Sequence, residues 1–230
     1  MTASHQVQGE WKARIAAEYT SAAITQAFVL WLIQAGAPPD LIDAGLVIVQ
    51  DELVHSRLSH DVYLAAGGAG APALDREKLG LRRSQASLEV DLLLSGVRVF
   101  CLGETVAVPL FSHLRQACTV EVARIALDRI LVDEVRHRDF GWDVLDWVLS
   151  TPLADEAPAL LAHALPSMLA ELDGSYGGDN RFVRADDGQM SQADRAWGLA
   201  PPREYADILA RTIARDYRPR FKARGISLPG

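Results

Sequence analysis

The fold is decided by one short pattern that the chain carries twice, "DELVH" at residues 51–55 and "DEVRH" at residues 133–137. Each copy has an acid pair, with a histidine three positions after the second acid, inside a largely apolar segment. Residues three apart on a helix share a face, so Glu52 lies beside His55 and Glu134 lies beside His137. The repeated pattern therefore predicts two helices that each present a carboxylate and an imidazole together.

The rest of the chain is also predicted to be helical, because no alternating strand pattern runs for long enough. Asp40 and Thr119 are the expected N-caps of the second and fourth helices. Pro109 is expected to kink the third helix, since proline lacks the backbone donor. The predicted helices cover roughly residues 7–35, 40–66, 84–117, 119–149, 155–172 and 203–224, and a polar segment at 173–200 is interpreted as either a lid or a surface loop.

The connections between these helices predict the topology. The first pair and the second pair are each joined by a short turn, so each pair is antiparallel. The Gly- and Pro-rich link at 67–80 can reach about 45 Å when extended, enough to run the length of a long helix. We therefore expect an all-α, ferritin-like up-down-down-up four-helix bundle at residues 1–150, with a helical C-terminal extension packed on it at residues 151–230.

Four glutamates fall at matching heights in this arrangement. Glu18 and Glu52 stand at nearly equal distances along the chain on either side of the turn near Gly36. Glu104 and Glu134 stand in the same way on either side of the turn near Cys118. Each glutamate pair thus lies at one level of an antiparallel helix pair, in apolar surroundings. Buried carboxylates cost several kcal/mol each unless cations balance them.

The pattern therefore predicts a dinuclear metal site. Carboxylate and imidazole ligands suit iron or manganese better than copper or zinc. A metal-bound imidazole usually donates its far N–H to a carboxylate, so Asp51 is expected to serve His137 and Asp133 to serve His55. The alternative for both aspartates is an interhelical salt bridge with an arginine such as Arg136. The six predicted ligands, which are also the predicted catalytic residues, are Glu18, Glu52, His55, Glu104, Glu134 and His137.

This ligand order resembles that of the ferritin-like di-iron carboxylate proteins, which use a Glu from each of two helices and Glu-x-x-His from each of the other two. The resemblance covers residues 7–150. The ligand spacing is similar to bacterioferritin, whereas the length and the C-terminal extension are more similar to the aldehyde-deformylating oxygenases. Leu53 stands where bacterioferritins usually have a haem-ligating Met, so haem is not implied. The resemblance implies two iron ions, with Mn/Fe or Mn/Mn pairs as alternatives, and O2 as a co-substrate.

The function that we favour from the sequence is that of a non-haem di-iron oxygenase or oxidase, which acts on a small organic substrate with an external electron donor. Small and apolar side chains near the ligands are expected to form its pocket, and close helix packing is the alternative explanation for the small ones. The second candidate is a ferroxidase, peroxide-consuming or iron-storage protein, and the third is a radical site that uses Tyr19 or Tyr63. The expected pocket residues are Ala22, Thr25, Ser56, Phe100, Cys101, Val108, Phe111 and Gly141.

The composition of the chain argues against several other classes of protein. A net charge of −7 and a pI near 5.3 argue against a nucleic-acid-binding surface, which needs a basic stripe. The two cysteines form no Cys-x-x-Cys pair, and no secretory signal is visible at the start, so a cytoplasmic protein is expected. The uncharged stretch at 19–39 is interpreted as a buried helix rather than a membrane span. A homodimer is left open.

Overall fold

The computed structural model describes residues 3–84, 87–176 and 190–229. Over these ranges the chain forms helices and connecting segments, without a strand. The all-α prediction is therefore confirmed for the described residues. The predicted segment at 173–200 falls partly outside them: its first residues continue a helix, and Gln192–Ala196 forms another.

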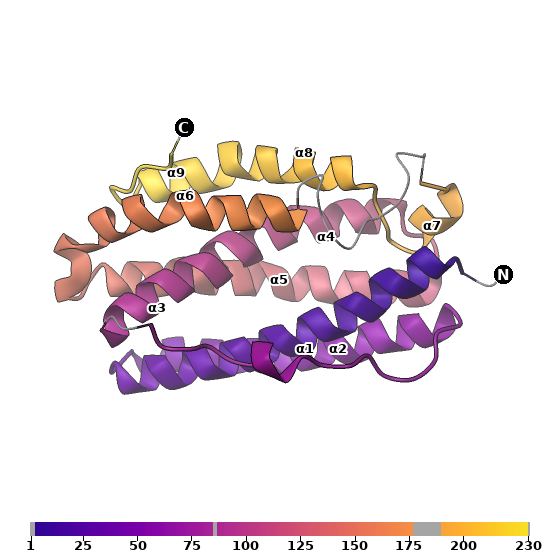
Figure 1. Cartoon of the computed structure of the whole chain (residues 1–230), viewed down its shortest axis with the longest axis horizontal. Coiled ribbons are helices and arrows are strands. Elements are labelled where there is room, and N and C mark those ends of the chain that lie inside the picture. Colours follow the sequence, from indigo (N-terminus) through magenta and orange to yellow (C-terminus); the bar gives the residue numbers. More distant parts are fainter. Residues whose placement is uncertain (1–2, 85–86, 177–189, 230) are drawn as a thin grey trace.

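Four long helical rods form the first two-thirds of the chain (Figure 1). In Figure 1, α1 and α5 run in one direction and α2 and α3–α4 run in the other. The third rod is continuous, because α3 passes through a π-helical segment, η2, into α4. The rods are α1 (His5–Gln34), α2 (Pro39–Ala65), α3 (Leu88–Gly96) with η2 (Val97–Glu104) and α4 (Thr105–Ala117), and α5 (Glu121–Val148).

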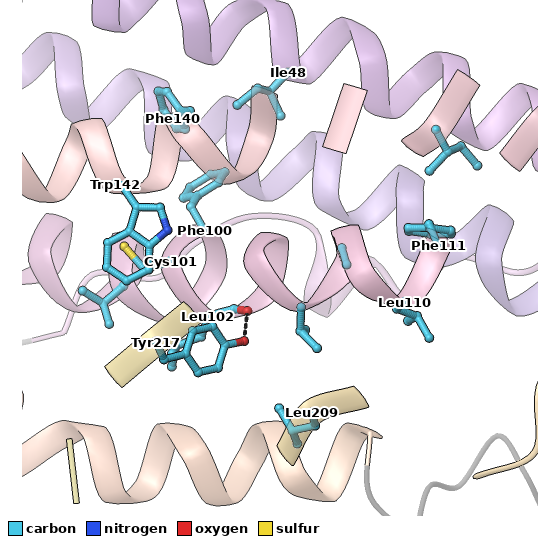
Figure 2. Packing of buried hydrophobic residues seen from close by; sticks show 14 of the residues in the cluster. Ile48, Phe100, Cys101, Leu102, Leu110, Phe111, Phe140, Trp142, Leu209 and Tyr217 are labelled. Carbon is cyan, nitrogen blue, oxygen red and sulfur yellow. Dashed lines mark hydrogen bonds between the residues drawn. The ribbon is translucent and has the colours of Figure 1, made fainter. Parts of the chain in front are cut away.

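These rods pack around a shared interior. α1 packs on α2, α2 packs on α5, α5 packs on η2 and α4, and α3 contacts α1. Aromatic rings fill the part of this interior nearest the α1–α2 turn. Phe100 lies 5.0 Å from both Phe28 and Phe140, measured between ring centroids, and Figure 2 shows Phe100 and Phe140 side by side.

The C-terminal segment lies against the third rod (Figure 1). Its α6 packs on α3 and on α8, and α8 packs on α4. Its elements are η3 (Pro152–Asp155), α6 (Ala157–Tyr176), α7 (Gln192–Ala196), α8 (Pro202–Thr212), the π-helical η4 (Ile213–Tyr217) and α9 (Arg218–Lys222).

Specific contacts join this segment to η2 and α5. The Tyr217 hydroxyl donates a hydrogen bond to the carbonyl oxygen of Leu102 at 2.5 Å (Figure 2). The ring of Phe221 lies 4.9 Å from that of Trp142, and the Trp142 indole N–H donates to Thr105 Oγ1 at 3.0 Å. Tyr217 thus holds η2 from the C-terminal segment, and Trp142 holds the residue directly after η2 from α5.

The expected irregularity in the third rod lies before Pro109 rather than at it. η2 spans Val97–Glu104, so Glu104 is its last residue. Pro109 follows in α4, where it cannot donate a hydrogen bond to the preceding turn. π-Helical segments inside α-helices are often found at functional sites.

Two predicted N-caps are wrong. α2 begins at Pro39, whose fixed φ suits the first helical position, so Asp40 lies inside the first turn. α5 begins at Glu121, and the N–H of Thr119 donates to the carbonyl of Ala196 at 2.9 Å. Neither helix has a side-chain cap: a proline removes one donor from the first turn of α2, and the Ala196 carbonyl holds the two residues before α5.

One described helix, Leu88–Ala117, is long and apolar enough to cross a membrane by composition alone. In its most apolar window, 56% of the residues are buried inside the structure. A core helix passes the same compositional test, and this one carries Glu104. The uncharged stretch at 19–39, considered from the sequence, lies mostly in α1, which packs on α2.

Candidate metal centre

The structure brings the six predicted ligand side chains together in the interior, and none of the six residues is more than 9% exposed. Their potential ligand atoms form two groups that share Glu52. One group is Glu18, Glu52 and His55, and the other is Glu52, Glu104 and His137, with all ligand atoms in a group within 4.8 Å of one another. Each rod contributes to this cluster, as the height-matching of the glutamates predicts.

Two carboxylates lie between the two imidazoles. Glu52 places its oxygens 3.7 Å from His55 Nδ1 and 3.4 Å from His137 Nδ1. Glu134 places its oxygens 4.0 Å from His55 Nδ1 and 3.7 Å from His137 Nδ1. Each of these two side chains therefore lies near both imidazole nitrogens.

The remaining two carboxylates lie one at each end. Glu18 Oε2 lies 3.9 Å from His55 Nδ1, and Glu104 Oε2 lies 3.9 Å from His137 Nδ1. Each imidazole nitrogen thus faces three carboxylates, two shared and one its own. The resulting arrangement has two equivalent halves.

The metal-free cluster is electrostatically unfavourable. Burial raises the pKa of Glu18 and of Glu134 well above the usual range, and nearby carboxylates raise it further. Burial and the charge of Glu52 likewise raise the pKa of Glu104. Burial alone would raise the pKa of Glu52, but contacts with His137 and His55 hold it below its usual range. Cations at the centre would remove this repulsion.

Unpartnered buried atoms show that this donor set fits metal ions. Glu52 Oε2, His55 Nδ1, Glu134 Oε2 and His137 Nδ1 are all buried without a hydrogen-bond partner. A buried polar atom without a partner costs about 1–3 kcal/mol, more when it is charged. All four atoms belong to the cluster, and the carboxylate and imidazole donors suit iron or manganese.

The far nitrogens of both imidazoles contact aspartates of the opposite motif. His55 Nε2 lies 3.1 Å from Asp133 Oδ2, and His137 Nε2 lies 3.3 Å from Asp51 Oδ2. This is the crossed arrangement expected from the sequence. Since a carboxylate accepts, each Nε2 carries a proton, and each Nδ1 faces the cluster, where it can bind an ion once it is deprotonated.

The same aspartates also form the alternative salt bridges. Arg136 Nη2 lies 2.8 Å from Asp51 Oδ2 and 2.7 Å from Asp133 Oδ1. Arg129 Nε donates to Asp133 Oδ2 at 2.5 Å, and its Nη2 lies 3.4 Å from Asp51 Oδ1. The two interpretations are therefore compatible, because each aspartate accepts from an imidazole and from half-exposed arginines.

A cavity of about 390 Å³ reaches the carboxylates from the side away from the aromatic rings. Most of its wall comes from α1 and from the third rod, and Ser175 of α6 and Tyr205 of α8 complete it. The lining residues are Glu10, Ala13, Arg14, Ala17, Glu18, Ser21, Glu52, Gly103, Glu104, Ala107, Leu110, Phe111, Glu134, Ser175 and Tyr205.

Most of the expected pocket residues lie outside this cavity. Phe111 lines the cavity, but Ala22, Thr25, Ser56, Phe100, Cys101, Val108 and Gly141 do not. Close packing explains Gly141, because a Cβ there would lie 2.7 Å from the backbone of Phe100. Its carbonyl also accepts from the Cys101 thiol at 3.1 Å, and the Ser56 hydroxyl donates to the Ile15 carbonyl at 3.1 Å.

The missed lining residues lie one and two turns before Glu18. Glu10, Arg14 and Glu18 are spaced by four, which puts them on one helical face, and this spacing would have identified them. Tyr205 and Ser175 carry no such signal. The two tyrosines considered for a radical site do not line the cavity: Tyr19 is 40% exposed, and the Tyr63 hydroxyl donates to the carbonyl of Ala69 at 3.2 Å.

A scan against protein-family models found no match for this chain, and searches of curated proteins and of solved structures found none either.

Proposed function

We propose that this chain is a ferritin-like up-down-down-up four-helix bundle with a dinuclear non-haem centre, and that it uses O2 to oxidise a small organic substrate. The observation that carries the proposal is the cavity that opens directly onto Glu18, Glu52, Glu104 and Glu134. Pockets that combine apolar walls with a few convergent polar groups are typical of small-molecule sites.

Each half of the cluster would hold one ion. Glu18 and His55 would bind the first, Glu104 and His137 would bind the second, and Glu52 and Glu134 would bind both. When bound, two ferrous ions supply the electrons and the binding positions that O2 reduction requires. Mn/Fe and Mn/Mn pairs fit the same donors.

Other residues of the chain hold the ligand side chains in position and provide apolar surroundings for the site. Asp133 and Asp51 fix the two imidazoles, and the Ser21 hydroxyl donates to Glu52 Oε1 at 2.9 Å. Ala107, Leu110 and Phe111 form an apolar wall beside Glu104, which suits the carbon skeleton of a substrate. Turnover of such a centre requires an external electron donor, and a homodimer is compatible with the proposal.

Oxygen uptake separates this function from iron handling. The apo-protein is loaded anaerobically with Fe(II), and O2 consumption is measured with and without a panel of small organic compounds. Light scattering gives the particle size. Substrate-stimulated uptake by a small oligomer supports the proposal. Rapid, substrate-independent oxidation of excess iron by a large cage would instead support a ferroxidase or storage protein.

A further inference from the structure

The cavity wall contains a buried cation that the proposed centre does not use. Among the described residues that line the cavity, Arg14 is the single cationic one. It is only 8% exposed, and its Nη1 is buried without a hydrogen-bond partner. A buried guanidinium nitrogen without an acceptor is costly, and the cavity that Arg14 lines is the side from which a ligand could supply an acceptor to the guanidinium.

The guanidinium is held rigidly. Its central carbon lies 4.2 Å from the ring centroid of Trp11 and 5.4 Å from that of Phe111. Trp11 is itself fixed, because its indole N–H donates to the carbonyl of Trp197 at 3.0 Å. A stacked guanidinium loses little conformational freedom when it binds an anion.

The contact between Arg14 and Glu10 leaves N–H donors of the guanidinium unused. Glu10 Oε1 lies 3.5 Å from Arg14 Nη2, beyond the usual 2.7–3.2 Å range of an N–H···O hydrogen bond. A guanidinium has five N–H donors, so this one loose contact does not saturate it.

Charge balance leaves Arg14 with a single loosely bound carboxylate, that of Glu10, once the centre is filled. Two divalent ions carry four positive charges, which match Glu18, Glu52, Glu104 and Glu134. Asp51 and Asp133 are matched separately by Arg129 and Arg136. Glu10 is then the carboxylate beside Arg14 in the cavity that no ion would balance.

From these contacts we infer that the substrate is an organic carboxylate whose carboxylate group binds Arg14 while its apolar part extends along Ala17 and Ala107 towards the centre. This inference rests on the proposed function and names the substrate class. Arg14 precedes Glu18 by one turn, about 6 Å along the helix. The oxidised carbon of the substrate therefore lies close to its carboxylate, which selects compact acids.

Binding titrations test this inference without turnover. Hexanoate and benzoate are titrated by calorimetry into the protein loaded with redox-quiet Mn(II), and hexanamide and benzamide serve as uncharged equivalents. The wild type is expected to bind each acid more tightly than its amide. Arg14→Gln should weaken acid binding by about tenfold or more, as expected for a lost charge-assisted hydrogen bond, and should change amide binding less than twofold.

Two further variants separate ligand binding from a structural role. Glu10→Gln removes the competing carboxylate and should tighten acid binding several-fold, whereas a purely structural Arg14–Glu10 pair predicts no tightening. Arg124→Gln, which removes a charge from α5 outside the cavity, should leave both affinities unchanged.

The outcomes distinguish the two proposals. Equal binding of acids by the wild type and Arg14→Gln would overturn the inference about Arg14 and leave the number of bound metal ions unaffected. Acids that bind only to the ions would give this result. Failure of the protein to take up two ions would overturn the proposed centre. In that case the inference about Arg14 is tested by the same titration on the purified protein without added metal, and the same results support or overturn it.

Discussion

Replacement of Glu134 by Gln should change stability in opposite directions with and without metal. The side chain is 2% exposed, and its Oε2 has no hydrogen-bond partner. Burial and the charges of Glu104 and Glu52 raise its pKa well above the usual range. A buried carboxyl group whose pKa is raised destabilises the folded state, and a neutral side chain of similar shape removes that cost. We therefore expect metal-free Glu134→Gln to gain about 1–3 kcal/mol, or roughly 2–12 °C in Tm for a chain of this length.

With metal bound, the wild type should instead be more stable than Glu134→Gln. An ion present at about a thousandfold above its Kd stabilises the folded wild type by about 4 kcal/mol, and the variant lacks a carboxylate oxygen that would bind the ions. The assay is differential scanning calorimetry of both proteins in chelator and, anaerobically, in Fe(II). Glu121→Gln, an exposed site on the same helix, should follow the wild type in both conditions. A lower metal-free Tm together with a wild-type metal shift would refute the reasoning.

Three other predictions follow from the same contacts. Asp133→Asn weakens the acceptor of His55 and should lower metal affinity by about 10–100-fold in chelator competition; unchanged affinity would remove Asp133 from the centre. In the metal-free protein, burial lowers the pKa of His137, but Asp51 and nearby glutamates raise it more, from 6.5 to about 10. The stability that His137 contributes is therefore complete below pH 6.5 and is lost at about 1.4 kcal/mol per pH unit as the pH rises towards 10. A free energy of unfolding, measured with denaturant, that stays constant over this pH range would contradict this prediction. Gly141→Ala places a Cβ 2.7 Å from the backbone of Phe100 and should cost about 1–3 kcal/mol in urea unfolding, despite the better helix propensity of alanine; an equal or higher stability would show that the π-helical segment shifts freely.

The sequence predicts the cluster well because helical spacing and height are simple functions of position. The three-residue spacing in "DELVH" and "DEVRH" places each carboxylate beside its imidazole, and counting from two turns brings Glu18 and Glu104 to the same level. The crossed contacts of Asp51 and Asp133 follow from their direction around the helix.

The position of the cavity could not be predicted in the same way. Helical phase shows which face of α1 points inward, but not which end of the interior remains open. Phe28, Phe100 and Phe140 pack together where part of the pocket was expected, and the cavity lies on the other side of the carboxylates, beside Phe111 and Arg14. The contribution of Tyr205 depends on how the C-terminal segment packs, which has no local signal in the sequence.

Anomalous diffraction from crystals grown anaerobically with Fe(II) tests the central claim most directly. The structure predicts two iron peaks per chain, both between Glu52 and Glu134, with His55 next to one and His137 next to the other. A single peak, none, or iron bound only at surface carboxylates would contradict it.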